Sequence, residues 1–338
     1  MAPRAFISGL SGLALTAEEC AFLRDARPWG LILFKRNIQD KTQVADLVRE
    51  ARDAVGADAP VLVDQEGGRV QRLQPPLWPV YPPGVAYGAI YDRDTEAGVA
   101  AARLGARLIA ADLIELGINV DCLPLADVPV SGADRVIGDR AYGETPGKVA
   151  AIAAAIAEGL ADGGVLPVLK HIPGHGRANA DSHEKLPVVH ADRATLEATD
   201  FAAFRPLKRL PLAMTAHVVF TAIDPVHPAT TSATMIGEVI RGFIGFGGLL
   251  MGDDVSMNAL SGTIAERARA SLKAGCDLVL HCNGKIDEMR AVASEASELS
   301  GEALRRADAA LAVRKSPSPI DLVAARRDFA AMMTSGIA

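Results

Sequence analysis

Short apolar runs alternate with longer amphipathic stretches along most of the chain. The apolar runs have the length of strands that are buried on both faces, and the stretches between them have helical periodicity. The expected strands are Arg4–Ser8, Gly30–Phe34, Pro60–Asp64, Ile118–Leu123, Leu166–Lys170, Leu212–His217, Gly248–Gly252 and Asp277–His281. The expected helices include Lys41–Val55, Thr95–Glu115, Pro146–Asp162, Asp192–Leu207, Ser232–Ile240, Ile264–Ala274 and Gly284–Glu298.

This alternation predicts a single (β/α)8 TIM-type barrel. Eight strands are the number that such a barrel needs, and alternation with helices implies parallel strands and right-handed crossovers. An open doubly wound sheet would carry a glycine-rich phosphate turn after its first strand. Gly9 and Gly12 lack the G-x-G-x-x-G spacing, which disfavours that fold. We therefore expect residues 1–338 to form one barrel domain, with a C-terminal helix at about 320–333 packed outside it.

The first residues weakly resemble a signal peptide. Arg4 precedes an apolar stretch, but Gly9 and Gly12 interrupt it. We interpret the segment as the first barrel strand, followed by a helix that begins after Thr16. Thr16 is a suitable N-cap, and the acidic Glu18-Glu19 pair is favourable in a first helical turn.

Composition excludes several classes of protein. Of the 338 residues 49% are hydrophobic and 22% are charged, so a large core can form and the composition disfavours disorder. The net charge of −6 argues against a nucleic-acid-binding protein, and no apolar run has the length of a membrane span. The four cysteines have neither a disulfide framework nor metal-ligand spacing, so we expect a reducing compartment, the cytoplasm.

Polar residues gather where the expected strands end. The segment Asp64–Arg69, D-Q-E-G-G-R, follows the third strand, and Lys170-His171 ends the fifth. His217 ends the sixth strand, and Asp253 follows the seventh. Because the carboxyl ends of barrel strands converge on one mouth, we expect these residues to form a single site.

The segment Lys170–His183, K-H-I-P-G-H-G-R-A-N-A-D-S-H, is the richest in titratable groups. It holds three of the seven histidines and follows the apolar run Val165–Leu169. Pro173, Gly174 and Gly176 disfavour a helix, so a shaped loop is expected. Histidine gives and takes protons near neutrality, and cations bind polar substrates. The segment therefore predicts chemistry rather than a solvated loop with incidental histidines.

These motifs resemble those of glycoside hydrolase family 3, specifically its bacterial β-N-acetylglucosaminidases. Members carry K-H-F-P-G-H-G, a short spacer and then D-S-H. Here Ile172 replaces the usual Phe, and the spacer Arg177–Ala180 is less typical in sequence but fits in length. Three further segments match family motifs: V-D-Q-E-G-G-R-V-Q-R-L at 63–73, V-I-G-D-R-A-Y at 136–142 and M-G-D-D-V-S-M at 251–257.

The resemblance implies a role for individual residues. It makes Asp253 the nucleophile and His183 the acid/base, and Asp181 could orient the imidazole of His183. A carboxylate suits an oxocarbenium-like sugar centre, which it can stabilise and then bond. The implied contacts to the sugar are those of Asp64, Arg72, Arg140, Lys170 and His171.

The activity that the resemblance implies is exo-acting and retaining. It releases N-acetylglucosamine from peptidoglycan fragments, N-acetylglucosamine joined to anhydro-N-acetylmuramic acid with or without peptide, through a covalent glycosyl-enzyme. We expect no metal and no cofactor. The expected partner is this small carbohydrate substrate, a muropeptide, with no nucleic acid and no membrane, and the protein is expected to be a monomer.

Three alternatives are weighed against this activity. In a metal-dependent amidohydrolase, His171, His175, His183 and His217 would join Asp253 around two metal ions, but the first strand lacks a His-x-His pair. A glycoside phosphorylase stays open, because a neutral histidine repels phosphate less than a carboxylate would. A non-enzymatic sugar-binding module is disfavoured, since few such modules place a nucleophile and an Asp/His pair at one mouth.

Overall fold

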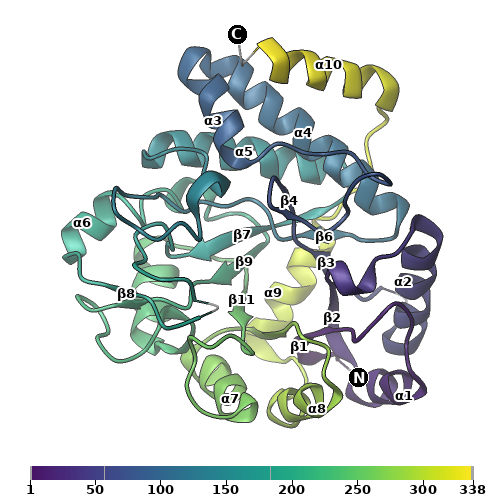
Figure 1. Ribbon diagram of the computed structural model, residues 1–338. Helices are drawn as coiled ribbons and strands as arrows, with labels where there is room; N and C mark the ends of the chain where they lie inside the picture. The colour runs from purple at the N-terminus through teal and green to yellow at the C-terminus, as the bar shows by residue number, and fades with distance from the viewer. Residues whose placement is uncertain (1, 57, 183, 336–338) are drawn as a thin grey trace.

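Parallel strands form a closed barrel at the centre of the molecule, with helices around it (Figure 1). This computed structural model describes residues 2–56, 58–182 and 184–335. Around the barrel the strands follow the order β1, β2, β3, β6, β7, β9, β11 and β12, and β12 pairs with β1. Their bounds are Arg4–Gly9, Pro28–Leu33, Val61–Val63, Val120–Asp121, Leu166–Ile172, Leu212–Thr215, Leu249–Asp254 and Leu278–His281.

Each of the eight expected strands corresponds to one barrel strand, so the predicted (β/α)8 barrel is confirmed. All of the pairs between neighbours are parallel. The strands could be found in the sequence because their side chains are almost all buried, which makes each of them a nearly continuous apolar run.

The helices between the strands mostly begin and end where the sequence predicts. Thr16 caps α1 in a capping box, because its hydroxyl accepts a hydrogen bond from the Glu19 N–H and the Glu19 carboxylate accepts one from the Thr16 N–H. The helices are α1 Ala17–Ala26, α2 Lys41–Val55, α3 Gly84–Arg93, α4 Thr95–Glu115, α5 Pro146–Asp162, α6 Arg193–Ala198, α7 Ile264–Ala274, α8 Ile286–Glu295, α9 Gly301–Ala312 and α10 Leu322–Ser335.

Two expected helices differ from the structure. The expected helix Asp192–Leu207 stops at Ala198, and only a 3-10 turn, Arg205–Leu207, follows it. The interruption lies where the Asp200 carboxylate turns to accept hydrogen bonds from Arg177, at 3.0 and 2.9 Å. The expected helix Ser232–Ile240 is a π-helix at Met235–Phe243.

Two pairs of short strands and two helices were not expected from the sequence, and the strand pairs lie at the mouth of the barrel. The antiparallel hairpin of β4 (Gln65–Gly67) and β5 (Val70–Gln71) extends from the end of β3. A parallel pair, β8 (Val188–Val189) and β10 (Val219–Phe220), joins the loops that follow β7 and β9. The two unexpected helices are α3 and α9.

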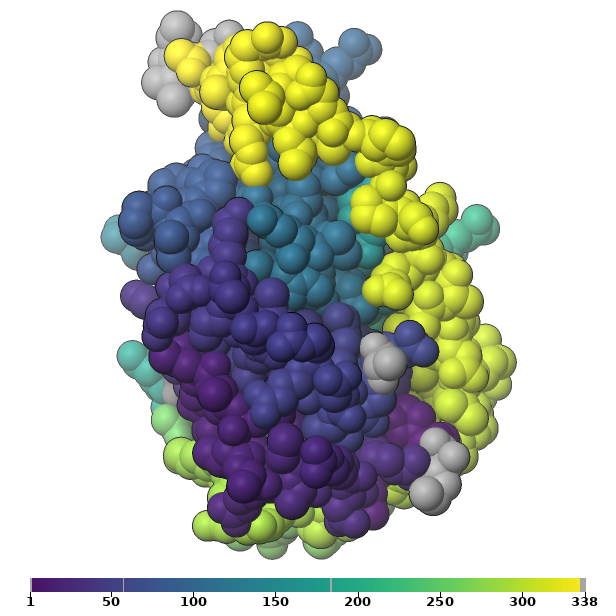
Figure 2. Space-filling model, turned by 90° about the vertical axis from the view of Figure 1, so that its right-hand side faces the viewer, coloured from purple at the N-terminus to yellow at the C-terminus, as the bar shows by residue number. Residues whose placement is uncertain are grey.

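The C-terminal segment crosses the outside of the barrel to reach α10. Figure 2 shows it running up one side of the molecule, with α10 at the top over the helices that follow β5. Arg326 of α10 donates a hydrogen bond to the buried Asp112 at 2.6 Å, and Phe329 stacks near Tyr81 and Tyr87. Among the described helices, none combines the length and the apolar character that crossing a bilayer requires.

Candidate active site

A cavity of about 330 Å³ opens at the carboxyl ends of the barrel strands. Its walls come from the ends of β2, β3, β7, β9, β11 and β12, as a barrel active site requires. The structure brings together in this cavity seven of the eight residues that the sequence predicts for the site: Asp64, Arg72, Arg140, Lys170, His171, Asp181 and Asp253. The eighth, His183, lies outside the described residues.

Asp64 is held between two cations at the end of β3. One oxygen of its carboxylate lies 2.8 Å from the Lys170 Nζ, and the other lies 3.1 Å from the Arg72 Nη2. Burial alone would raise the pKa of Asp64, but these two positive charges outweigh it and hold the pKa below its usual range. Asp64 is therefore ionised at neutral pH and can only accept hydrogen bonds.

Glu66 lies in the D-Q-E-G-G-R segment expected at the barrel mouth, but the sequence reasoning gave it no role of its own. It lines the cavity from β4 and makes a bidentate pair with Arg140, with N–O distances of 2.8 and 2.7 Å. Its carboxylate also lies 2.6 Å from the Lys170 Nζ. Burial opposes ionisation, but the Arg140 and Lys170 charges lower the pKa of Glu66 to about 2. Asp64 and Glu66 thus share Lys170, whose side chain is 2% exposed.

His171 is oriented by a carboxylate that no motif indicated. Its Nδ1 lies 2.8 Å from Asp127, which is completely buried in the loop after β6. Burial favours the neutral acid, but the nearby His171 lowers the pKa of Asp127, so the carboxylate is the acceptor and Nδ1 carries the proton. The other ring nitrogen of His171 is then the one available to a ligand in the cavity.

His175 lies in the wall of the cavity. Its Nε2 lies 3.2 Å from the hydroxyl of Ser182, the central residue of D-S-H, and its ring packs edge-on against His171. Burial and the neighbouring His171 lower the pKa of His175 to about 4, so the ring is neutral at pH 7. The contact between His175 and Ser182 ties the end of this loop to its beginning.

The two aspartates at the end of β11 have different surroundings. Asp254 is occupied by structural contacts, because its carboxylate accepts hydrogen bonds from the Cys282 N–H at 3.1 Å and from the Ser256 hydroxyl at 2.5 Å. Asp253 lines the cavity, and one of its oxygens accepts a hydrogen bond from the Asp254 N–H at 2.8 Å. Both aspartates line the cavity, and the carboxylate of Asp254 is the one tied to Ser256 and Cys282.

The expectation that His217 lies at the mouth with the other polar residues is wrong. Its side chain is completely buried behind the end of β11 and does not line the cavity. The ring nitrogens are instead engaged by Thr230 and by the carbonyl oxygen of Asp254. The position of His217 at a strand end could be read from the sequence, but the direction of its side chain could not.

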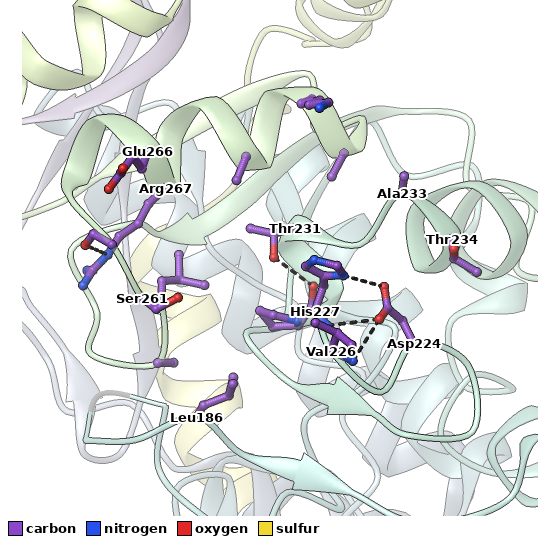
Figure 3. A pocket seen from close by; sticks show the side chains of 17 residues that line it. Leu186, Asp224, Val226, His227, Thr231, Ala233, Thr234, Ser261, Glu266 and Arg267 are labelled. Carbon is purple, nitrogen blue, oxygen red and sulfur yellow. Dashed lines mark hydrogen bonds and ion pairs between the residues drawn. The ribbon is translucent and has the colours of Figure 1, made fainter.

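A larger cavity, of about 880 Å³, lies beside the barrel mouth, between α7 and the loop after β10 (Figure 3). It contains none of the predicted site residues, and its Asp224 is already paired with Ser232 and His227. The smaller cavity is therefore the candidate active site. In residues 2–56, 58–182 and 184–335, no group of three or more His, Cys, Asp or Glu side chains could hold a metal ion.

Comparison with known proteins identifies the family. Residues 8–313 match the description "Glycosyl hydrolase family 3 N terminal domain". A β-hexosaminidase of Alkalilimnicola ehrlichii is 43% identical over 283 residues, which cover 81% of this chain and 79% of that protein. A β-hexosaminidase of Aromatoleum aromaticum is 38% identical over 278 residues, covering 81% of this chain and 78% of the relative.

Solved structures agree with the sequence relatives. NagZ from Neisseria gonorrhoeae, in complex with N-trifluoroacetyl-D-glucosamine, superposes with a TM-score of 0.86 at 32% identity, covering 99% of this chain and 98% of its own. A family 3 β-N-acetylglucosaminidase from Paenibacillus gives a TM-score of 0.84 at 29% identity, over 97% of this chain and 67% of that one. The chain therefore belongs to glycosyl hydrolase family 3, among its bacterial β-N-acetylglucosaminidases.

Proposed function

We propose that the protein is an exo-acting, retaining β-N-acetylglucosaminidase that acts on peptidoglycan fragments. The substrate is N-acetylglucosamine joined to anhydro-N-acetylmuramic acid, with or without peptide. The observation that carries the proposal is the cavity of about 330 Å³, whose walls combine Asp253 with a cluster of two carboxylates and three cations. A cavity of this size suits one terminal sugar residue, and the gonococcal NagZ structure holds a monosaccharide derivative.

In the proposed mechanism Asp253 attacks the anomeric carbon while the glycosidic bond breaks. The leaving oxygen takes a proton from His183, and a covalent glycosyl-enzyme forms. His183 then removes a proton from water, which displaces Asp253, so that two inversions give net retention. Asp181 accepts a hydrogen bond from the imidazole and steadies its positive charge.

The electrostatics of the cavity support a histidine as the proton donor. A retaining glycosidase usually donates the proton from a second carboxylic acid. Two further carboxyl groups of the cavity, Asp64 and Glu66, have pKa values lowered by the neighbouring cations. Both are therefore ionised at neutral pH and cannot supply the proton, whereas an ordinary histidine titrates in the right range.

Five residues are proposed to hold the sugar. Asp64 accepts hydrogen bonds from hydroxyl groups, and the cations donate to hydroxyl and N-acetyl oxygens, which the planar fork of arginine suits well. These residues are Asp64, Arg72, Arg140, Lys170 and His171. We further propose that the protein acts in the cytoplasm as a monomer of one catalytic domain.

Preference for the N-acetylated sugar tests this function. The kcat/KM for the 4-nitrophenyl β-N-acetylglucosaminide should exceed that for the β-glucoside by up to ~10⁴-fold, because the polar groups of the site stay unpaired without the acetamido group. Steady-state assays with both glycosides measure the ratio. The same assay with inorganic phosphate separates hydrolysis from phosphorolysis, since N-acetylglucosamine 1-phosphate as the main product would favour the phosphorylase. Equal rates for the two glycosides would contradict the proposed specificity.

Arg140→Ala should weaken the binding of N-acetylglucosamine itself. Removing the guanidinium leaves Glu66 with Lys170 as its remaining ion-pair partner and removes a donor from the cavity wall. A hydrogen bond to a charged group contributes about 1.5–3 kcal/mol, so the Kd should rise about 10-fold or more. Titration calorimetry measures it. Arg103→Ala is the matched control, because Arg103 pairs with Asp162 on the outer helices. An unchanged Kd in a folded Arg140→Ala protein would show that Arg140 does not bind the sugar.

A further inference from the structure

His217 contacts the backbone of the residue that follows Asp253. Its Nε2 lies 3.0 Å from the carbonyl oxygen of Asp254. A carbonyl oxygen can only accept a hydrogen bond, so Nε2 carries the proton and donates it. The ring is completely buried and lies outside the cavity, which means that it cannot meet the substrate.

Two buried threonines fix the orientation of this ring. The Nδ1 of His217 lies 2.7 Å from the Thr230 hydroxyl oxygen, which in turn lies 2.7 Å from the Thr215 hydroxyl oxygen. With a neutral ring, Thr215 donates to Thr230 and Thr230 donates to Nδ1. With a protonated ring, Nδ1 donates to Thr230, whose own proton can turn to the Ala216 carbonyl at 3.2 Å. In both states Nε2–H continues to donate to Asp254.

The backbone at Asp253 needs such support because the pairing of β11 with β12 is irregular there. The register between β11 and β12 shifts between Met251 and Asp254, so the ladder does not by itself fix this stretch. Asp254 is held there from three sides. Its N–H donates to Asp253, its carboxylate accepts from Cys282 and Ser256, and its carbonyl accepts from His217.

We propose that His217 is a positioning residue for the nucleophile, acting through the backbone of Asp254 in the step that forms the glycosyl-enzyme. The inference rests on the proposed role of Asp253. A carboxylate that attacks a carbon must lie within a narrow range of distance and direction, and a displacement of about 1 Å can cost ~10²-fold in rate. Loss of the His217 contact should therefore slow attack without changing how the sugar is held.

Two substitutions of similar size distinguish the effect of the hydrogen bond from the effect of packing. His217→Leu removes the donor, whereas His217→Gln can present an amide N–H near the position of Nε2. The single-turnover rate with an activated aryl glycoside should fall ~10–100-fold in His217→Leu and recover at least in part in His217→Gln. The Kd for N-acetylglucosamine should stay within about 3-fold of the wild-type value in both, because neither residue touches the ligand. His190→Leu, at an exposed histidine, is the matched control and should have the normal rate.

Thr230→Val gives an independent readout, because it keeps the volume but removes the hydroxyl that orients the ring. Its rate should fall by less than that of His217→Leu, again with an unchanged Kd. A normal rate in Thr230→Val would overturn the inference even if His217→Leu fails to fold. A normal rate in folded His217→Leu would also overturn the inference. So would a loss of affinity for N-acetylglucosamine in this variant as large as its loss of rate. Normal turnover by Asp253→Ala would instead overturn the proposed nucleophile, so the two failures are distinguishable.

Discussion

Asp253→Ala is expected to lower turnover by at least ~10⁴-fold, the scale seen when one member of a catalytic unit is removed. Without the carboxylate no covalent intermediate can form, and the oxocarbenium-like transition state loses its stabilising negative charge. The fold should persist, because the side chain of Asp254, which ties the end of β11 to Ser256 and Cys282, stays in place. Activity assays together with circular dichroism and thermal unfolding check both statements.

Chemical rescue sharpens this test. Azide can occupy the space of the missing carboxylate and attack from the same face, so Asp253→Ala with an activated aryl glycoside should yield the α-glycosyl azide. Asp254→Ala is the comparison, and it should lose stability and yield no such product. Near-normal turnover by Asp253→Ala, together with inactivity of Asp254→Ala, would show that the nucleophile is assigned to the wrong aspartate.

His183→Ala should slow substrates with poor leaving groups far more than activated aryl glycosides. General acid catalysis contributes typically ~10²–10⁴-fold, and it matters most when the leaving oxygen is basic. The loss should therefore approach this range for the natural disaccharide and be small for a nitrophenyl glycoside. Single-turnover rates are the proper measurement, since a slow second step can hide the contrast.

A matched variant distinguishes this role from a structural one. His175→Ala removes the neighbouring histidine that touches Ser182, and it should slow both classes of substrate by a similar factor. Equal losses for the two classes in His183→Ala itself would mean that His183 serves only to shape the loop. In Asp181→Asn the difference between poor and activated leaving groups should be intermediate between those of His183→Ala and His175→Ala. The variant keeps a hydrogen-bond acceptor but loses the charge that steadies the imidazolium.

The barrel could be predicted because each of its strands is buried on both faces, and because its helices have well-defined ends. Helix α3 was missed because Gly84 and Gly88 weaken its helical pattern. The structure explains these glycines, since a Cβ at Gly84 would collide with the carbonyl of Arg140 and one at Gly88 with that of Tyr142. Close packing against the loop that carries Arg140 thus overrides local propensity there.

Much of the candidate site could also be anticipated, because the carboxyl ends of parallel strands meet at one mouth whatever their separation in sequence. The roles of Glu66 and Asp127 could not be found in this way. A sequence shows that a carboxylate is present, but not that Arg140 and Lys170 will surround one of them or that His171 will face the other. The hairpin of β4 and β5, which the sequence did not reveal, is what carries Glu66 into the cavity.

The covalent intermediate is the most direct test of the account. A 5-fluoro-N-acetylglucosaminyl fluoride slows both steps but leaves the second slower, so the glycosyl-enzyme should accumulate. Proteolysis and tandem mass spectrometry should then find the sugar on one peptide, attached to Asp253. Attachment to Asp254 or to any other residue, or turnover with inversion and no labelled peptide, would contradict the double displacement proposed for this cavity.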